Sequence, residues 1–230
     1  MKFWRLYNSA EKEVGFVPQI VQPVFDGQYT DKNQLWNIHV KQIDNAIIIP
    51  KGYLHKRAKL TDLMSDSFLN NQRFVSEKLR KIIERYPCKG IQFADTEVIT
   101  PKVGKIKANI LHPFATDRSY IDMSQTEFQI STVKGEIINE RLKLNSMKDF
   151  LEIREAHIIE SKKYDDINLH KWISISKLFF KKNVDFGICS VFDVLYGGGV
   201  GFYVSQKLKD EILNEECTGI IFCEIDEQYP

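Results

Sequence analysis

The side chains best suited to acid–base or metal chemistry are scattered along this chain. Histidine is the usual general base near neutral pH and a common metal ligand. The five histidines are His39, His55, His112, His157 and His170. None stands in the H-x-x-x-H or H-E-x-x-H spacing that puts two metal ligands on one face of a helix. The sequence therefore predicts no catalytic histidine, no metal site and no bound cofactor.

The cysteines also lack a reactive arrangement. They are Cys88, Cys189, Cys217 and Cys223. None forms a C-x-x-C pair, and their neighbours are mainly glycine, isoleucine and phenylalanine, which favours burial as reduced thiols. No serine stands in a G-x-S-x-G turn either. An enzyme would need histidine, cysteine or carboxylate side chains that meet only in space, with His39, His112 or His157 beside an acid in one pocket.

A glycine-rich run at residues 197–201 invites comparison with a phosphate loop. Such a loop follows a strand and leads directly into a helix through Lys and Ser or Thr. Here the glycines precede Phe202-Tyr203-Val204, and the next helix is expected only after Ser205. We therefore expect a flexible turn and no nucleotide site. The residues that we expect to contact a protein partner are Tyr196, Gly197, Gly198 and Gly199.

The composition is that of an ordinary globular protein. The chain has 230 residues, 43% hydrophobic and 27% charged, with 32 Lys and Arg against 31 Asp and Glu. Such a chain can bury a substantial core and is not intrinsically disordered. No segment approaches the roughly 20 apolar residues of a membrane span, and no apolar signal-peptide core follows Lys2. We expect a cytoplasmic protein without a membrane partner.

Two short basic clusters interrupt this charge balance locally. The first comprises Lys51, Lys56, Arg57 and Lys59 around Tyr53 and His55, and the second Lys177, Lys181 and Lys182 beside Phe179 and Phe180. Acidic residues elsewhere offset both, and the net charge is only +1. Because so small a charge exerts no general attraction on nucleic acid, we expect solvated faces here and no nucleic-acid partner.

The most distinctive pattern is a segment of 21 residues that occurs twice. Residues 73–93 read RFVSEKLRKIIERYPCKGIQF, and residues 202–222 read FYVSQKLKDEILNEECTGIIF. Aligned without gaps, the copies agree at nine positions, which include the Ser, Lys and Leu at the start and the Gly and Phe near the end. A duplication of this length indicates a structural unit that is used twice.

Each copy carries the signals of a capped helix between two strands. Ser76 and Ser205 suit helix N-caps, and Gly90 and Gly219 suit the turn after the helix. The apolar stripe at helical spacing comprises Leu79, Ile82, Ile83 and Tyr86 in the first copy and Leu208, Ile212 and Leu213 in the second. The sequence thus predicts two similar strand–helix–strand units, each with a helix of about ten residues packed on a sheet.

Apolar patterning predicts the remaining elements. Strands are expected at Lys2–Tyr7, Leu35–Val40, Ala46–Ile49, Glu97–Thr100, Lys105–Leu111, Glu127–Ser131, Glu136–Asn139 and Lys171–Ser176, with turns at Gly104 and Gly135. Lys59–Met64 fits a short helical or turn element, Met147–Ile158 fits a helix or a helix followed by a strand, and Asp185–Leu195 fits either a strand or a helix.

These elements predict an α+β fold with a mostly antiparallel sheet and a few packed helices. Residues 1–230 are expected to form a single compact domain. Two intimate lobes with a boundary near residues 130–170 are the alternative.

Three blocks of the sequence resemble blocks in the immunity proteins of bacterial polymorphic-toxin systems. They are Ala58–Leu63 with Phe74–Leu79, Lys107–His112 with Tyr120–Phe128, and Tyr203–Leu208 with Thr218–Phe222. On these residues the chain is similar to immunity family eleven, with family forty-three as the near alternative. The blocks span roughly residues 58–128 and 200–224.

The resemblance implies a small intracellular α+β protein, encoded beside a toxin, that neutralises its cognate toxin by binding. It supplies no catalytic residues. The expected function is therefore that of a non-enzymatic immunity-type protein. The alternatives are an enzyme of unrecognised type, with a spatially assembled His, Cys or carboxylate site, and a phage or mobile-element accessory protein that binds a host factor.

Overall fold

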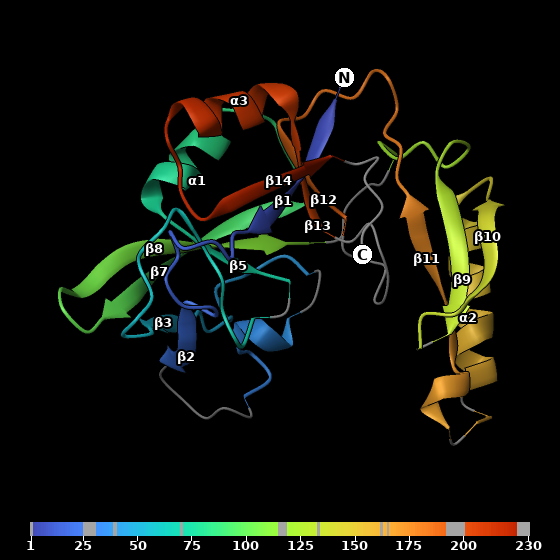
Figure 1. Cartoon of the computed structure of the whole chain (residues 1–230), viewed down its shortest axis with the longest axis horizontal. Coiled ribbons are helices and arrows are strands. Elements are labelled where there is room, and N and C mark those ends of the chain that lie inside the picture. The colour runs from blue at the N-terminus through green and yellow to red at the C-terminus, as the bar shows by residue number, and fades with distance from the viewer. Residues whose placement is uncertain are drawn as a thin grey trace. The chain divides into compact units, whose positions relative to one another are not determined.

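A computed structural model of the chain (Figure 1) describes residues 2–24, 31–38, 41–69, 71–114, 119–132, 134–161, 163–164, 166–191 and 201–224. The chain divides into two compact units. Unit 1 comprises Met1–Thr116, Asp185–Phe192 and Gly201–Cys223, and unit 2 comprises Asp117–Val184, Asp193–Val200 and Glu224–Pro230. The chain enters unit 2 after residue 116 and first leaves it after residue 184. The first of these points precedes the range 130–170 expected for a lobe boundary, and the second follows it.

Unit 1 contains two sheets. The five-stranded sheet has the order β14 (Ile220–Glu224), β1 (Phe3–Asn8), β13 (Gly201–Ser205), β12 (Ile188–Val191) and β6 (Cys88–Lys89). The six-stranded sheet has the order β2 (Ile20–Val24), β3 (Lys51–Leu54), β7 (Ile91–Thr100), β8 (Gly104–Pro113), β5 (Arg73–Val75) and β4 (Leu63–Met64). Most pairings are antiparallel, whereas β3 with β7 and β12 with β6 are parallel.

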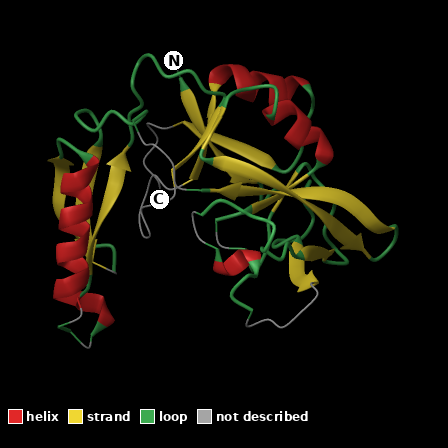
Figure 2. Cartoon of the chain, turned by 180° about the vertical axis from the view of Figure 1, so that it is seen from behind, coloured by secondary structure: helices red, strands yellow, loops and turns green. Residues whose placement is uncertain are grey.

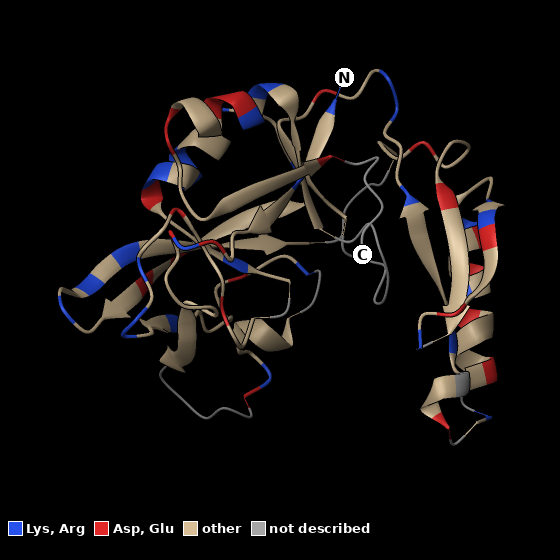
Figure 3. Ribbon diagram, in the orientation of Figure 1, with Lys and Arg blue, Asp and Glu red and all other residues tan. Residues whose placement is uncertain are grey.

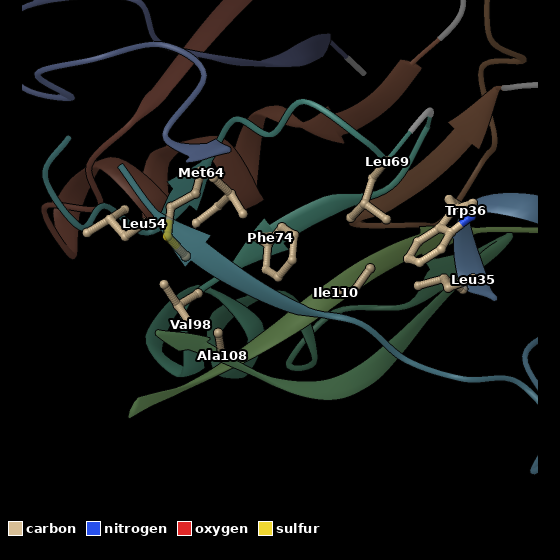
Figure 4. Close-up of a cluster of buried hydrophobic side chains, with 10 residues drawn as sticks. Leu35, Trp36, Leu54, Met64, Leu69, Phe74, Val98, Ala108 and Ile110 are labelled. Atoms are coloured by element: carbon tan, nitrogen blue, oxygen red, sulfur yellow. The ribbon is translucent and has the colours of Figure 1, made fainter. Parts of the chain in front are cut away.

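The β7–β8 hairpin is the longest pairing of the six-stranded sheet. Gly104 begins its second strand with φ +84°, a left-handed conformation that favours glycine, so the predicted turn is confirmed. One face of the sheet supplies a core cluster around Phe74, Val98 and Ile110, together with Trp36 (Figure 4). Apolar residues from segments far apart in the sequence therefore close over this face.

Two helices of unit 1, α1 (Glu77–Ile83) and α3 (Gln206–Asn214), lie side by side in Figures 1 and 2. Both predicted N-caps are confirmed. The Ser76 hydroxyl accepts a hydrogen bond from the Leu79 amide at 3.0 Å, and the Ser205 hydroxyl accepts one from the Leu208 amide at 3.3 Å. These bonds satisfy backbone donors that have no partner inside the helix.

The carboxylate of Asp62 joins the two copies of the duplicated segment. Its Oδ1 accepts a hydrogen bond from the Ser76 hydroxyl at 2.6 Å, and its Oδ2 accepts one from the Thr218 amide at 2.9 Å. The Ser76 amide also donates to the Asp62 carbonyl. One acidic side chain therefore fixes the start of α1 to the turn that follows α3.

The two copies differ in detail. Helix α1 has 7 residues and α3 has 9, and only the first copy has a two-residue strand, β6, between its helix and its final strand. Leu213, which the helical spacing assigned to the apolar stripe, is 52% exposed. The equivalence of the two segments as folded units stays a prediction.

Unit 2 is built on a three-stranded antiparallel sheet. Strand β9 (Glu127–Thr132) lies between β10 (Ile137–Lys143) and β11 (Lys171–Lys177). Helix α2 (Met147–Ser161) runs along one face of this sheet (Figure 2), where the Phe128 and Phe150 rings lie 5.3 Å apart. The segment Met147–Ile158, which fitted two interpretations, is therefore helical throughout.

Three sequence-based expectations are wrong. Leu35–Val40 is not a strand over its described residues: Leu35–Asn37 forms a 3-10 helix, and the Leu35 and Ile38 carbonyls lie within hydrogen-bond range of the Gln72 side-chain amide instead of a neighbouring strand. Ala46–Ile49 forms only an isolated bridge between Ile48 and Gln34. Within Lys59–Met64, the last two residues form strand β4, which pairs with β5.

The fold class is confirmed. The described residues form three α-helices and mostly antiparallel sheets, with about 41% of residues in strands, which is an α+β fold. Over the same residues, no helix has both the length and the apolar character needed to cross a membrane.

Candidate functional site

The candidate site is an open cleft of about 810 Å³ in unit 1, where three segments meet. The segment after α1 contributes Arg85–Pro87, the segment before β12 contributes Asp185–Gly187, and the start of α3 contributes Ser205–Lys207, Asp210 and Glu211. Two of these segments belong to the two copies of the duplicated sequence. The cleft therefore forms where the copies face each other.

A hydrogen-bonded ion pair crosses the cleft. The Tyr86 hydroxyl donates to one oxygen of Glu211, and Arg85 Nη1 lies 2.5 Å from the other oxygen. Donation to this carboxylate raises the pKa of Tyr86 to about 12, and the same hydrogen bond lowers the pKa of Glu211. At neutral pH, Tyr86 therefore stays protonated and Glu211 stays ionised.

Close packing fixes the position of the Tyr86 ring. A methyl group added at Gly187 would lie 2.2 Å from Tyr86 Cβ, so only glycine allows this approach. The Gly187 amide donates to the Pro87 carbonyl at 2.8 Å, which joins the two segments through the backbone. Lys207 Nζ lies 5.8 Å from the centre of the Tyr86 ring, within cation–π range.

The first turn of α3 is joined to β1 through Trp4. The indole Nε1 donates to Gln206 Oε1 at 2.7 Å, and Gln206 Nε2 donates to Asp210 Oδ1 at 2.7 Å. Lys209 Nζ lies 3.0 Å from the centre of the Trp4 ring. This chain of contacts orients the α3 side of the cleft.

The cleft presents both charges beside aromatic rings. Arg85 and Lys207 are cationic, whereas Asp185, Asp210 and Glu211 are acidic. The tyrosine is protonated near pH 7, and the lowered pKa of its carboxylate partner makes Glu211 a weak base. What the arrangement can do is recognise a partner that carries both charges and an apolar contact.

The sequence did not single out these residues as a site. It assigned Tyr86 to the apolar stripe of the first copy, but Tyr86 follows the end of α1 and lines the cleft. The signal was a difference between the copies, because Glu211 occupies the position of buried Ile82. A charge that replaces an apolar residue in a duplicated helix indicates a new contact. The residues predicted to contact a partner, Tyr196, Gly197, Gly198 and Gly199, lie outside the described residues.

The two described histidines named for a spatially assembled site lie in different units. His112 belongs to unit 1 and His157 to unit 2, while His39 lies outside the described residues. His157 is on α2, where its Nδ1 lies 3.5 Å from Glu160 Oε2. Where the chain is described, no three His, Cys, Asp or Glu side chains cluster as ligands for a metal ion.

His112 is completely buried and holds a segment of backbone. Its Nε2 lies 2.7 Å from the Lys41 carbonyl, and its Nδ1 lies 3.4 Å from Gln72 Nε2. Burial lowers the pKa of His112, so the ring is neutral at pH 7. Gln72 Nε2 also donates to the Ile38 carbonyl at 3.1 Å. The pair anchors the backbone at Leu35, Ile38 and Lys41 to the sheet.

None of the four cysteines, all of which lie within the described residues, forms a disulfide bond. Burial raises the pKa of Cys88 and of Cys217 to about 11, and it raises the pKa of Cys189 well above its ordinary value. Because the thiolate is the nucleophilic form, these three side chains are unreactive near neutral pH.

A smaller hollow of about 430 Å³ lies on unit 2. It is lined by Glu127, Gln129, Ile137, Glu140, Arg141, Ser176 and Lys177 of the three-stranded sheet. This hollow has no aromatic side chain in its lining, so the cleft of unit 1 is the better candidate.

No protein-family model matches the sequence, and no curated protein matches it. The similarity to the immunity families therefore rests on the residue blocks quoted above.

Proposed function

We propose that this protein is a non-enzymatic, immunity-type protein of the cytoplasm that binds and neutralises a cognate bacterial toxin through the cleft between α1 and α3. The resemblance of the residue blocks motivates the class of protein. The observation that carries the proposal is the cleft itself, in which tyrosine, arginine, lysine and three acidic side chains converge from three segments.

The chemistry of the cleft favours binding over catalysis. Tyrosine and arginine are common at energetically important positions of protein interfaces. The Tyr86–Glu211 and Arg85–Glu211 contacts hold these side chains in place before a partner arrives, which reduces the entropy lost on binding. Exposed Lys207 and Asp210 then offer opposite charges to a partner within one helical turn.

Protection of cells is the experiment that tests this function. The product of the neighbouring reading frame is expressed in a bacterial host with and without this protein, and growth is followed. We expect the wild-type protein to restore growth and to co-purify with that product. A toxic neighbour whose effect is unchanged by this protein, or a pair that does not bind, would contradict the proposal.

Charge reversals test whether the cleft is the contact. Lys207→Glu and Asp210→Lys alter exposed side chains, so the fold should persist. Like charges facing each other in an interface cost several kcal/mol, so each change should abolish protection. Glu155→Lys on the exposed part of α2 is the matched control and should protect as well as wild type.

A further inference from the structure

The six-stranded sheet brings together basic residues that are distant in the sequence. Strands β3 and β7 pair in parallel with Tyr53 beside Ile99, and β7 pairs with β8 with Ile99 beside Lys105. Two residues away along each of these strands, on the same face of the sheet, Lys51, Glu97 and Lys107 form a second row. We name the face formed by these six residues the Tyr53 face.

The Tyr53 face is open at the hairpin end of the sheet. Tyr53 is 37% exposed, and the side chain of Lys105 is 62% exposed. Lys107 is also exposed. The ribbon of Figure 3 shows basic residues along the same hairpin. A stackable ring is therefore accessible on a strongly basic surface.

The charges on this face do not cancel. Glu97 Oε2 lies 3.1 Å from Lys51 Nζ and 3.8 Å from Lys105 Nζ, and Glu97 stands opposite Lys107 in the strand register. The pKa of Glu97 is lowered, chiefly by its hydrogen bond to Lys51, so it stays ionised. One carboxylate among three lysines leaves a charge of +2 on the six-residue face.

A second group of basic and aromatic side chains lies near Tyr53 in the sequence. Two residues after Tyr53, the His55 ring stacks on Phe16 with 3.8 Å between the ring centres. The Arg57 guanidinium lies 4.7 Å from the centre of the Phe16 ring. His55 and Arg57 belong to the first basic cluster, for which the sequence alone predicted no nucleic-acid partner. Sheet pairing adds Lys105 and Lys107 to that cluster.

We propose that the Tyr53 face binds single-stranded nucleic acid, with a base stacked on Tyr53 and phosphates contacted by Lys51, Lys105 and Lys107. Proteins that bind single strands combine a basic surface with aromatic side chains on which bases stack. An acidic peptide would use the lysines but would gain no stacking on Tyr53. The ring therefore favours a nucleic-acid strand as the occupant, and this activity is independent of the function proposed above.

Fluorescence anisotropy with labelled 15-nucleotide single strands of DNA and RNA tests the proposal. We expect saturable binding that weakens with salt, with a log–log slope of about −2 for three phosphate contacts. Lys105→Ala with Lys107→Ala should weaken binding about 10-fold and make the slope shallower by about 1.4. The corresponding double change to Arg should retain binding, because it preserves the charge.

The Tyr53 variants separate stacking from charge. Tyr53→Ala should weaken binding about 10-fold, within the range measured for loss of one stacked base, whereas Tyr53→Phe should bind like wild type. Lys148→Ala on α2, whose side chain is 82% exposed, is the control and should change nothing. No saturable binding at 50 mM salt would overturn the proposal. Equal binding of polyglutamate, unaffected by Tyr53→Ala, would overturn it in favour of an acidic protein segment.

Discussion

The carboxyl group of Asp66 provides a quantitative test of the structure. Its Oδ1 accepts hydrogen bonds from the Phe68 amide at 3.1 Å and the Leu69 amide at 2.5 Å. Desolvation outweighs these bonds and the nearby charge of Arg73, and it raises the pKa of Asp66 from 3.8 to about 6. The folded state therefore holds the Asp66 proton to a higher pH than the unfolded chain does.

The direction of the pH dependence follows from this difference. Between about pH 4 and pH 6 the folded protein binds more protons at Asp66 than the unfolded chain, so this residue makes the protein less stable as pH rises through that window. A shift of about two pKa units corresponds to at most ~3 kcal/mol. The contribution of Asp66 is thus fully favourable below pH 4 and is lost above pH 6.

Asp66→Asn removes the titration and keeps the turn, because an amide oxygen accepts the same two backbone hydrogen bonds. We expect this variant to be more stable than wild type by up to ~3 kcal/mol at pH 7.5 and nearly equal to it at pH 4. Urea unfolding followed by tryptophan fluorescence, in a Trp172→Phe background so that Trp4 and Trp36 report unit 1, measures the difference.

Asp31→Asn is the matched control. Asp31 Oδ1 accepts the Asn33 amide at 2.9 Å in an exposed turn of the same kind, so its replacement should change stability by only a few tenths of a kcal/mol. If Asp66→Asn lowered stability at pH 7.5, or left the slope between pH 4 and pH 6 unchanged, our account of Asp66 burial would be refuted.

Three further outcomes are expected. Ser76→Ala should cost ~2 kcal/mol in urea unfolding and Ser205→Ala ~1 kcal/mol, because only Ser76 also donates to Asp62; equal costs would contradict this. Gly219→Ala should lower the free energy of unfolding by more than 2 kcal/mol, because the backbone there has φ +77° and the added Cβ would lie 2.3 Å from a backbone oxygen. Gly104→Ala has open space around the added Cβ and should lower the free energy of unfolding by only ~1 kcal/mol. Cys217 should react slowly with iodoacetamide at pH 8 and faster as pH approaches its pKa of about 11; fast labelling at pH 7 would contradict this.

Local signals in the sequence predicted several parts of the fold. The serine caps at Ser76 and Ser205 depend on a hydroxyl and an amide only three residues apart. The turns at Gly104 and Gly135 depend on a left-handed backbone, at φ +84° and +85°. Such features need no knowledge of distant residues, which is why spacing and residue type were sufficient.

Features decided by distant contacts were not predictable in this way. The segment after Gln34 looked like a strand, yet the Leu35 and Ile38 carbonyls lie within hydrogen-bond range of Gln72 Nε2, which is 34 to 37 residues away. The residues near Leu35 do not indicate that the buried side-chain amide of Gln72 will take the hydrogen bonds that a neighbouring strand would otherwise make. Likewise, Lys105 joins Lys51 on one face only because β3 and β8 both pair with β7.

The candidate site was missed for the same reason. The cleft needs Arg85–Pro87 to approach Gly187, which is 100 residues beyond Pro87, and the start of α3, which is 19 residues beyond Gly187. The duplicated segment was visible in the sequence, but an alignment of two helices does not say which of their side chains will face each other. Glu211 at the position of Ile82 became interpretable only when Tyr86 and Arg85 were seen beside it.

The affinity of the protein for the product of its neighbouring gene tests the central claim most directly. Isothermal titration calorimetry is carried out with wild type, Lys207→Glu, Asp210→Lys and the control Glu155→Lys, each first shown to be folded by circular dichroism. We predict tight binding by wild type and by the control, and a dissociation constant at least 10-fold larger for each cleft variant. Unchanged affinity in both cleft variants would contradict the assignment of the cleft as the partner-binding site.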